Sequence, residues 1–270
     1  MSSVSLSRPG FRSLILCIGL GCLIALAGCA SWGKEPDKTR NWSAQKLYSE
    51  AKAAMNDGDY FTAVDYYEKL ESRFPFGPYA SQAQLEVAYA FYKNDEPESA
   101  IAAADRFIKL HPRHPSVDYA YYLKGLVNFN RDRGFIARII PGDDAKRDAA
   151  ARLASFQDFA ELTRRFPESK YSEDARQRML YLRNSLARHE VYVADYYFRR
   201  GAYVAAVNRA KYAVENFPTA PVLPDALAIM VKAYAELEMT DLAADALRVL
   251  KHNYPAHPGL PEVEGLAQAN

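Results

Sequence analysis

The sequence GDYFTAV at residues 58–64 returns as GAYVAAV at residues 201–207. In both places the glycine is followed 17 residues later by the proline of a Phe-Pro pair. The same frame occurs without the glycine in two further segments, 95–112 and 238–255, which end in His-Pro and Tyr-Pro. Self-similarity at a fixed spacing is the sequence signature of a repeat architecture, so we expect this chain to consist of stacked copies of one unit.

Each copy carries a small residue 12 positions before its proline. In the first copy this residue is Ala63, and Tyr67 and Leu70 follow it on the same face of a helix. A small side chain lets a second helix cross closely over a first. The proline ends the second helix, because the residue before a proline is pushed out of the α region. The corresponding small residues elsewhere are Ala100, Ala206 and Ala243, with Ser155 in a weaker fifth copy.

This pattern resembles the tetratricopeptide repeat, a pair of antiparallel helices of roughly 34 residues. The prolines of regular copies lie 37 residues apart here, and the tryptophan of the strict consensus is missing. The resemblance implies an all-α fold, a right-handed solenoid of about five tetratricopeptide-like helix pairs.

Two intervals between prolines exceed the regular spacing. Pro112 and Pro167 are 55 residues apart, which predicts an insertion in the third unit over about 131–147. Pro167 and Pro218 are 51 residues apart, which predicts an extra long helix over 171–190 before the fourth unit begins near residue 189. Four arginines on this helix form either a solvated face or a basic surface for a partner: Arg176, Arg178, Arg183 and Arg188.

The amino-terminal end is predicted to be a cleaved signal. Arg8 and Arg12 precede an apolar run that is too short to cross a membrane as a helix. The run ends in Leu-Ala-Gly-Cys at residues 26–29, which resembles a bacterial lipobox and predicts cleavage before Cys29 and lipidation of that cysteine. The alternative is an ordinary secretory signal with a cysteine there by chance. Ala30 stands where aspartate retains many Gram-negative lipoproteins in the inner membrane, so it favours the outer membrane.

The predicted organisation has five parts: a signal peptide at 1–28, a lipidated cysteine and tether at 29–41, amino-terminal repeats at 42–167, carboxy-terminal repeats at 168–258 and a frayed tail at 259–270. Cys17 and Cys22 leave with the signal, so the mature chain has no disulfide and relies on its core. Removal of the signal leaves 32 basic residues against 33 acidic ones. This balance provides no electrostatic footprint for nucleic acid.

We find no arrangement of residues for catalysis, and we predict that the protein is not an enzyme and needs no cofactor. The sequence lacks G-x-S-x-G, H-E-x-x-H and a phosphate-binding glycine loop. His111 and His114 are interpreted as a repeat boundary and not as a metal site, because a proline between them breaks helical spacing.

Two longer strings resemble the BamD family, the repeat lipoproteins of the β-barrel assembly machinery. The first is RFPFGPY at 73–79 with AYAFYKN at 88–94, and the second runs from YVADYY at 192–197 to AVNR at 206–209. The similarity spans residues 42–255, nearly the whole mature chain. It implies a lipid-anchored protein on the periplasmic face of the outer membrane, which binds unfolded outer-membrane proteins and promotes their folding and insertion. The alternative is a periplasmic repeat lipoprotein that holds cell-wall enzymes.

The resemblance also implies partners. These are a BamA-like barrel-forming assembly protein, bound through its periplasmic domains, other assembly lipoproteins, unfolded outer-membrane proteins and the inner leaflet of the outer membrane. In this family the first repeats receive the substrate, and the candidate substrate-binding residues here are Arg73, Phe74, Phe76, Tyr79, Tyr89 and Tyr92. The aromatic rings would line a groove for an extended peptide, and Arg73 would meet a carboxylate. The alternative is that these rings only seal two repeats together.

The fourth and fifth repeats hold the barrel partner in this family. Arg209 matches the family arginine implicated in that contact, and Tyr196 and Tyr197 complete the predicted partner-binding set. Arg209 is offset from the buried stripe of its helix by about a third of a turn, so its side chain can reach outward. The alternative is an intramolecular ion pair with Glu215 or Asp195.

Overall fold

The structure is a computed structural model that describes residues 37–131 and 149–269. The predicted signal, Cys29, most of the tether and nearly all of the predicted insertion lie outside the described residues. The chain divides into two units, residues 1–43 and 44–270. In the described part of the first unit, Oδ1 of Asp37 accepts hydrogen bonds from the backbone N–H and the hydroxyl of Thr39, at 3.0 and 2.7 Å.

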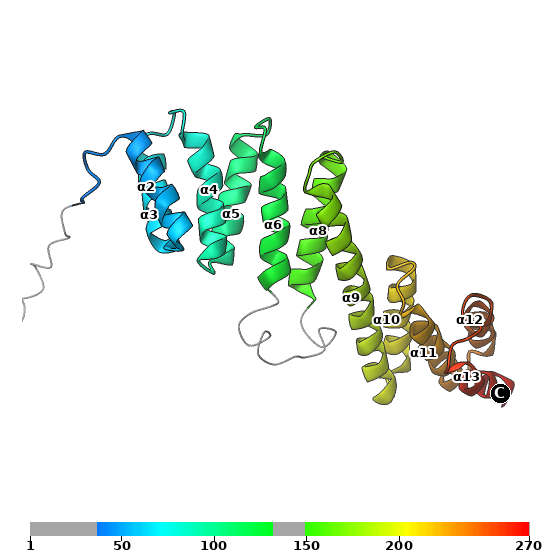
Figure 1. Cartoon of the computed structure of the whole chain (residues 1–270). Coiled ribbons are helices and arrows are strands. Elements are labelled where there is room, and N and C mark those ends of the chain that lie inside the picture. Colours follow the sequence, from blue (N-terminus) through cyan, green and yellow to red (C-terminus); the bar gives the residue numbers. More distant parts are fainter. Residues whose placement is uncertain (1–36, 132–148, 270) are drawn as a thin grey trace, which may run out of the picture. The chain divides into compact units, whose positions relative to one another are not determined.

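Every regular element in the described part of the second unit is a helix, and each packs on its neighbours in chain order (Figure 1). None of the described helices combines the length and the apolar character needed to span a membrane. The helices are α2 (Ala44–Asp57), α3 (Tyr60–Arg73), α4 (Ala80–Lys93), α5 (Pro97–Leu110), α6 (Val117–Arg131), α8 (Ala150–Arg165), α9 (Ser172–Arg199), α10 (Tyr203–Asn216), α11 (Leu223–Glu236), α12 (Thr240–Asn253) and α13 (Leu260–Ala269). The consecutive packed pairs confirm the predicted tetratricopeptide-like solenoid.

The turn inside a helix pair has one geometry in four of the pairs. Gly58 and Gly201 adopt positive φ angles of 79° and 73°. Asp95 and Glu238 occupy the equivalent positions without being glycine, and their φ angles are 62° and 57°. Glycine enters this left-handed region at no steric cost, whereas a side chain with a Cβ is strained there. The shared frame at 58, 95, 201 and 238 is therefore a shared backbone conformation.

The linkers between pairs also repeat one pattern of backbone hydrogen bonds. In the first linker, the N–H of Gly77 donates to the carbonyl of Phe74 at 3.4 Å, and the N–H of Ala80 donates to the carbonyl of Gly77 at 3.0 Å. The same two bonds recur in the linkers that begin at His111, Phe166, Phe217 and Tyr254. A proline follows the first residue of each linker and prevents the preceding helix from continuing. The constant linker starts each new helix in the same register.

The predicted crossing residues are buried. Ala63, Ala100, Ala206 and Ala243 all lie in the core, as does Ser155, whose hydroxyl donates to the carbonyl of Gly125 at 2.9 Å. Gly125 is itself a close-approach point, because a Cβ built on it would lie 2.4 Å from the ring of Phe159. The small side chains therefore set how closely the two helices of a pair approach each other.

The extra helix before the fourth unit is confirmed, but its boundary differs from the prediction. The sequence predicts a break near residue 189, whereas α9 runs without interruption for 28 residues. Ala175 and Leu182 in its first half join the core cluster of α8, and Val191 and Ala194 in its second half join that of α10 and α11. No glycine or proline lies between 172 and 199, so nothing in the local sequence ends the helix at the junction.

The predicted frayed tail is wrong for the residues that form α13. This helix packs on α11 and α12, and Val263 is fully buried against Leu227 and Leu250. Two ion pairs tie it down, Lys232 to Glu262 at 2.6 Å and Lys251 to Glu264 at 2.9 Å. The Gly- and Pro-containing sequence of this tail suggests disorder. However, the linker that begins at Tyr254 leads into α13, which packs like the first helix of a further pair.

Candidate binding groove

A groove of about 540 Å³ runs across the first helices of the first three pairs. Most of its lining belongs to α2, α4 and α6, because each first helix presents the same face to this side. The lining residues are Lys52, Met55, Asn56, Tyr60, Gln82, Leu85, Glu86, Tyr89, Lys93, Ser116, Tyr119 and Tyr171. Helical spacing explains the set: on α4, positions 82, 86, 89 and 93 lie on one stripe, and on α2 so do 52 and 56.

Glu86 is the fixed carboxylate of this groove, and its side chain is only 13% exposed. It accepts hydrogen bonds from the hydroxyls of Tyr48, at 2.9 Å, and Tyr67, and from Nε2 of Gln82 at 2.8 Å. The ammonium of Lys52 lies 3.2 Å away. Burial, and then the hydrogen bond to Glu86, raises the pKa of both Tyr48 and Tyr67, so both remain donors. This network joins α2, α3 and α4.

Tyrosine rings form the far part of the groove. Tyr119 lies 5.4 Å from Tyr171, measured between ring centroids, and Tyr171 stacks on Tyr122 at 4.8 Å. Burial raises the pKa of Tyr119, and the nearby Tyr89 adds to the effect. Tyr119 therefore stays neutral, and the far part of the groove is an uncharged aromatic wall.

The six predicted substrate-binding residues do not lie together. Tyr89 lines the groove. Tyr79 is not part of the lining, and its ring stacks on that of Tyr48 with the centroids 5.1 Å apart. The hydroxyl of Tyr92 accepts a hydrogen bond from Nδ2 of Asn130 at 2.6 Å, which turns it towards the end of α6. The other three belong to the end of α3 and its linker: Arg73 ends the helix, Phe74 caps it, and Phe76 is 99% exposed.

The sequence prediction missed the polar half of the groove. Lys52, Glu86 and Lys93 are not among the six predicted residues, although helical spacing on α4 places Glu86 and Lys93 beside Tyr89. What the sequence does not carry is the pairing of faces from different helices, which depends on how α2 and α4 stack.

The predicted partner-binding residues lie on α9 and α10. Arg209 forms an ion pair with Glu190 at 3.0 Å, and its side chain is 48% exposed. The alternative that Arg209 forms an intramolecular ion pair is therefore confirmed, but its partner is Glu190 and not Glu215 or Asp195. Tyr196 is exposed and packs edge-on against Tyr197, with ring centroids 5.9 Å apart.

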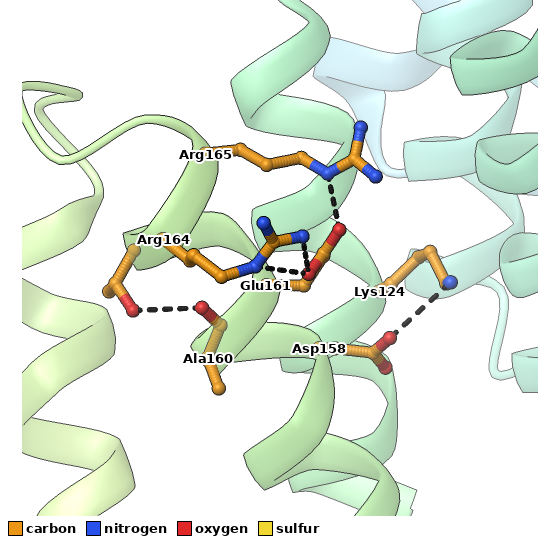
Figure 2. A network of polar contacts seen from close by, with 7 residues as sticks. Lys124, Asp158, Ala160, Glu161, Arg164 and Arg165 are labelled. Atoms are coloured by element: carbon orange, nitrogen blue, oxygen red, sulfur yellow. Dashed lines mark hydrogen bonds and ion pairs between the residues drawn. The ribbon is translucent and has the colours of Figure 1, made fainter.

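A separate polar network joins the second and third pairs. Lys124 of α6 lies 2.7 Å from Asp105 of α5. It also lies 3.3 Å from Asp158 of α8, a contact drawn in Figure 2. On α8 the carboxylate of Glu161 accepts hydrogen bonds from two arginines of its own helix, Arg164 and Arg165. These charges satisfy one another within the fold.

Three of the four predicted arginines of α9 also have hydrogen-bond partners within the fold. Arg178 binds Asp174 at 2.5 Å, Arg176 donates to the carbonyl of Pro167 at 3.1 Å, and Arg183 contacts the side chain of its neighbour. Their contacts favour the interpretation as a solvated face. Among the described residues no group of three His, Cys, Asp or Glu side chains could hold a metal ion.

Comparisons with known proteins place these features in context. The family model described as YfiO, outer membrane lipoprotein, matches residues 40–250. The outer membrane protein assembly factor BamD of Neisseria gonorrhoeae is 46% identical over 252 residues, which cover 92% of this chain and 94% of that protein. BamD of Vibrio cholerae is 37% identical over 235 residues, 87% of this chain and 96% of that one. A solved thermophilic TPR protein of Thermus thermophilus is 14% identical, with a TM-score of 0.36 over 84% of this chain and 100% of that one.

Proposed function

Because the chain belongs to the BamD family of outer membrane protein assembly factors, we propose that it is a lipid-anchored subunit of the machinery that folds β-barrel proteins into the outer membrane. The observation that carries this proposal is 46% identity to a BamD along 92% of the chain. The fold supports it, since a helical solenoid with a lined groove is suited to holding other proteins. The proposed role is to bind and to position, without catalysis.

The groove is the proposed site for unfolded barrel proteins. An extended peptide presents alternate side chains on one side, and such a ligand needs a stiff surface with pockets for them. Tyr89, Tyr119 and Tyr171 offer aromatic faces, and the Glu86 network holds the first two pairs rigidly together. Phe76 projects from the nearby linker and offers a further apolar contact outside the groove.

Photocrosslinking in cells tests this assignment. A crosslinking residue placed at Tyr89 or Asn56 is expected to capture newly synthesised barrel proteins. The matched control is a crosslinker at Val249, which is exposed on α12 of the last complete pair. Capture from position 249 alone would contradict the assignment. Purification of the chain in mild detergent should also recover a large β-barrel partner, whereas recovery of cell-wall hydrolases would support the scaffold alternative.

The proposed anchor is the lipid on Cys29. Stable attachment to a membrane requires two or more acyl chains, which a serine cannot receive. The Cys29→Ser variant is therefore expected in the soluble fraction or at a wrong membrane, as measured by fractionation in cells depleted of the barrel partner. Cys22→Ser, which changes a cysteine inside the signal, should fractionate like the natural chain. Retention of Cys29→Ser in the outer membrane would contradict lipid anchoring.

The proposed contact for the barrel partner is centred on Arg209. Its guanidinium is half-exposed beside Glu190, so it can bind a second carboxylate from outside. Arg209→Glu should weaken pull-down of the partner's soluble domains by tenfold or more, equivalent to about 1.4 kcal/mol. Arg199→Glu is the matched control, because Arg199 is an exposed arginine that pairs with Asp195 on α9. Thermal melting checks the fold, and undiminished pull-down would overturn the assignment.

A further inference from the structure

We propose that the linkers after the first two helix pairs form a contact for an anionic phospholipid surface, with Phe76 as its apolar residue and Lys109 and Arg113 as its cations. These linkers lie at the edge of the array where the chain enters from the proposed lipid anchor, so the inference rests on that anchor for its orientation. It assigns Phe76, which lies outside the groove lining, to a membrane instead of a substrate.

The first linker presents an apolar ring on a stiff loop. Among the large hydrophobic side chains of the described chain, that of Phe76 is the most exposed, at 99%. Pro75 and Pro78 restrict the backbone on both sides of it, and the N–H of Gly77 donates to the carbonyl of Phe74. A ring held in this way loses little conformational freedom when it enters the interface of a bilayer, where aromatic side chains are favoured.

The second linker adds positive charge and a second apolar side chain. Lys109 and Leu110 end α5, and Arg113 follows within the linker; all three are exposed. Residues 72–79 and 109–116 contain no aspartate or glutamate. In the part of the chain that the structure describes, neither Lys109 nor Arg113 forms an ion pair. An anionic headgroup would therefore meet two uncompensated cations, and such cations are attracted to an anionic membrane surface.

A polar network fixes the two linkers relative to each other. Near the end of α3, Oε1 of Glu71 accepts a hydrogen bond from Nε2 of Gln84 at 3.2 Å, and Oε1 of Gln84 lies 2.6 Å from Nε2 of His111 in the second linker. The ring of Phe107 packs against His111 and His114, with centroids 5.2 Å apart in both cases. A lipid surface would therefore meet one preformed edge.

The topology directs this edge towards the anchor. Each second helix ends and each first helix begins at the linker edge, which runs along the upper side of the first three pairs in Figure 1. Because α2 is a first helix, the chain that comes from Cys29 enters the array at this edge, at Ala44. Fifteen residues separate Cys29 from Ala44, and they can span at most about 50 Å.

The linkers of the last two pairs do not share these features. Residues 217–222 and 254–259 contain no lysine or arginine. The cations and the exposed ring therefore collect at the end of the array that is next to the anchor in sequence.

Vesicle flotation of the mature chain with Cys29→Ser tests the contact without the lipid. We expect the chain to bind vesicles of phosphatidylethanolamine and phosphatidylglycerol, and to bind about tenfold or more weakly with Lys109→Gln, Arg113→Gln. Lys211→Gln, Arg248→Gln removes the same charge from exposed positions on α10 and α12 and should leave binding unchanged. Thermal melting checks the fold of both double variants. Absence of binding, or equal binding by the linker variant, would overturn the proposal.

A fluorescent label tests the position of Phe76. Cys29 is the one cysteine of the mature chain, so Phe76→Cys in the Cys29→Ser chain provides a single thiol for an environment-sensitive dye. Its emission should shift to shorter wavelength on the anionic vesicles, whereas a dye at Ala256→Cys, exposed in the last linker, should not shift. A shift caused by unfolded barrel proteins and not by vesicles would overturn the proposal and assign Phe76 to the substrate.

Failure of this inference is distinguishable from failure of the proposed anchor. Both vesicle measurements use the chain without lipid, whereas the anchor is tested by fractionation of Cys29→Ser in cells. Retention of that variant in the outer membrane would contradict the anchor, whatever the vesicles show.

Discussion

One residue in the turn of each of four helix pairs adopts a left-handed backbone conformation, and its side chain decides how strained that turn is. Glu238 holds a left-handed backbone at φ 57°, where Gly201 holds φ 73° in the preceding pair. A side chain with a Cβ costs roughly 1–2 kcal/mol in this region, whereas glycine avoids that cost but loses more conformational freedom on folding. The four turns are thus equivalent in shape but not in strain.

Replacing Glu238 with glycine should stabilise the protein. Glu238 is exposed, so the change removes strain without opening the core. We expect the free energy of unfolding to rise by about 0.5–1 kcal/mol, or a few degrees in Tm, measured by thermal melting. The reverse change in the equivalent turn, Gly201→Ala, should lower Tm. A lower Tm for Glu238→Gly would show that its side chain makes a contact that outweighs the strain.

At the scale of elements, hydrogen bonds between tyrosines and carboxylates join helices from different pairs. Tyr122 of α6 donates to Asp174 of α9 at 2.6 Å, and Arg178 binds the same carboxylate. Burial, and then the bond to Asp174, raises the pKa of Tyr122 to about 12. In the Glu86 network, the hydroxyls of Tyr48 and Tyr67 likewise join α2 and α3 to α4. Contacts of this kind tie one helix pair to another through directed bonds as well as through apolar packing.

The pH dependence of stability should report the contact of α6 with α9. Burial opposes ionisation of Asp174, but the hydrogen bonds from Arg178 and Tyr122 outweigh it and lower the pKa of Asp174 below its ordinary value. A carboxyl whose folded-state pKa is lowered stabilises the fold above its unfolded pKa, near 3.9. That contribution is lost as the pH falls through the lower, folded value. Asp174→Asn should remove this part of the acid sensitivity.

The measurement is Tm from pH 2 to pH 7 for the natural chain and for Asp174→Asn. At pH 7 the variant should lose about 1 kcal/mol or less, because the carboxylate is partly exposed and screened. Glu173→Gln, at the adjacent and more exposed position, is the matched control and should follow the natural curve. If Tm falls equally steeply with falling pH in the natural chain and in Asp174→Asn, the ionised carboxylate of Asp174 does not stabilise the contact of α6 with α9.

At the scale of the whole molecule, the long helix α9 is where the repeat pattern changes. Its first half serves as the first helix of one unit and its second half as the first helix of the next, with no second helix between them. A solenoid unit is stabilised by its neighbours, so the continuity of α9 couples the pairs before it to the pairs after it.

Breaking α9 at its junction should uncouple the two sets of repeats. Ala187 is fully buried midway along the helix, and Ala187→Pro removes a backbone hydrogen bond there and clashes with the preceding turn, at a cost of about 3 kcal/mol or more. We expect two separate transitions in thermal melting followed by circular dichroism. Ala187→Gly, which lowers helix propensity by about 1 kcal/mol, should melt in one transition. A single sharp transition for the proline variant would show that α9 does not couple the two sets.

The sequence by itself determined the repeat and most of the turns and linkers that bound its helices. Ala63 is small because a neighbouring helix crosses closely there, and Gly58 is a glycine because the turn needs a left-handed backbone. Both requirements are local, so residue type and spacing are enough to predict them. The resemblance in the strings at 73–79 and 192–209 led to the family. Local sequence signals gave a wrong prediction at two places. The sequence contains no glycine or proline that ends a helix near residue 189, and α9 runs through that point unbroken. The Gly- and Pro-containing composition of the tail suggested disorder, but its residues form α13.

Only the tertiary structure decided which side chains meet. Tyr89 was predicted from its string, but the sequence does not show that it shares a groove with Lys52 or that Glu86 accepts two tyrosine hydroxyls from other helices. Nor does it show that Arg209 pairs with Glu190, 19 residues before it. Helical period tells which residues of one helix share a face. Which faces of different helices oppose each other depends on the linkers and the packing of the core, and these exist only in the folded chain.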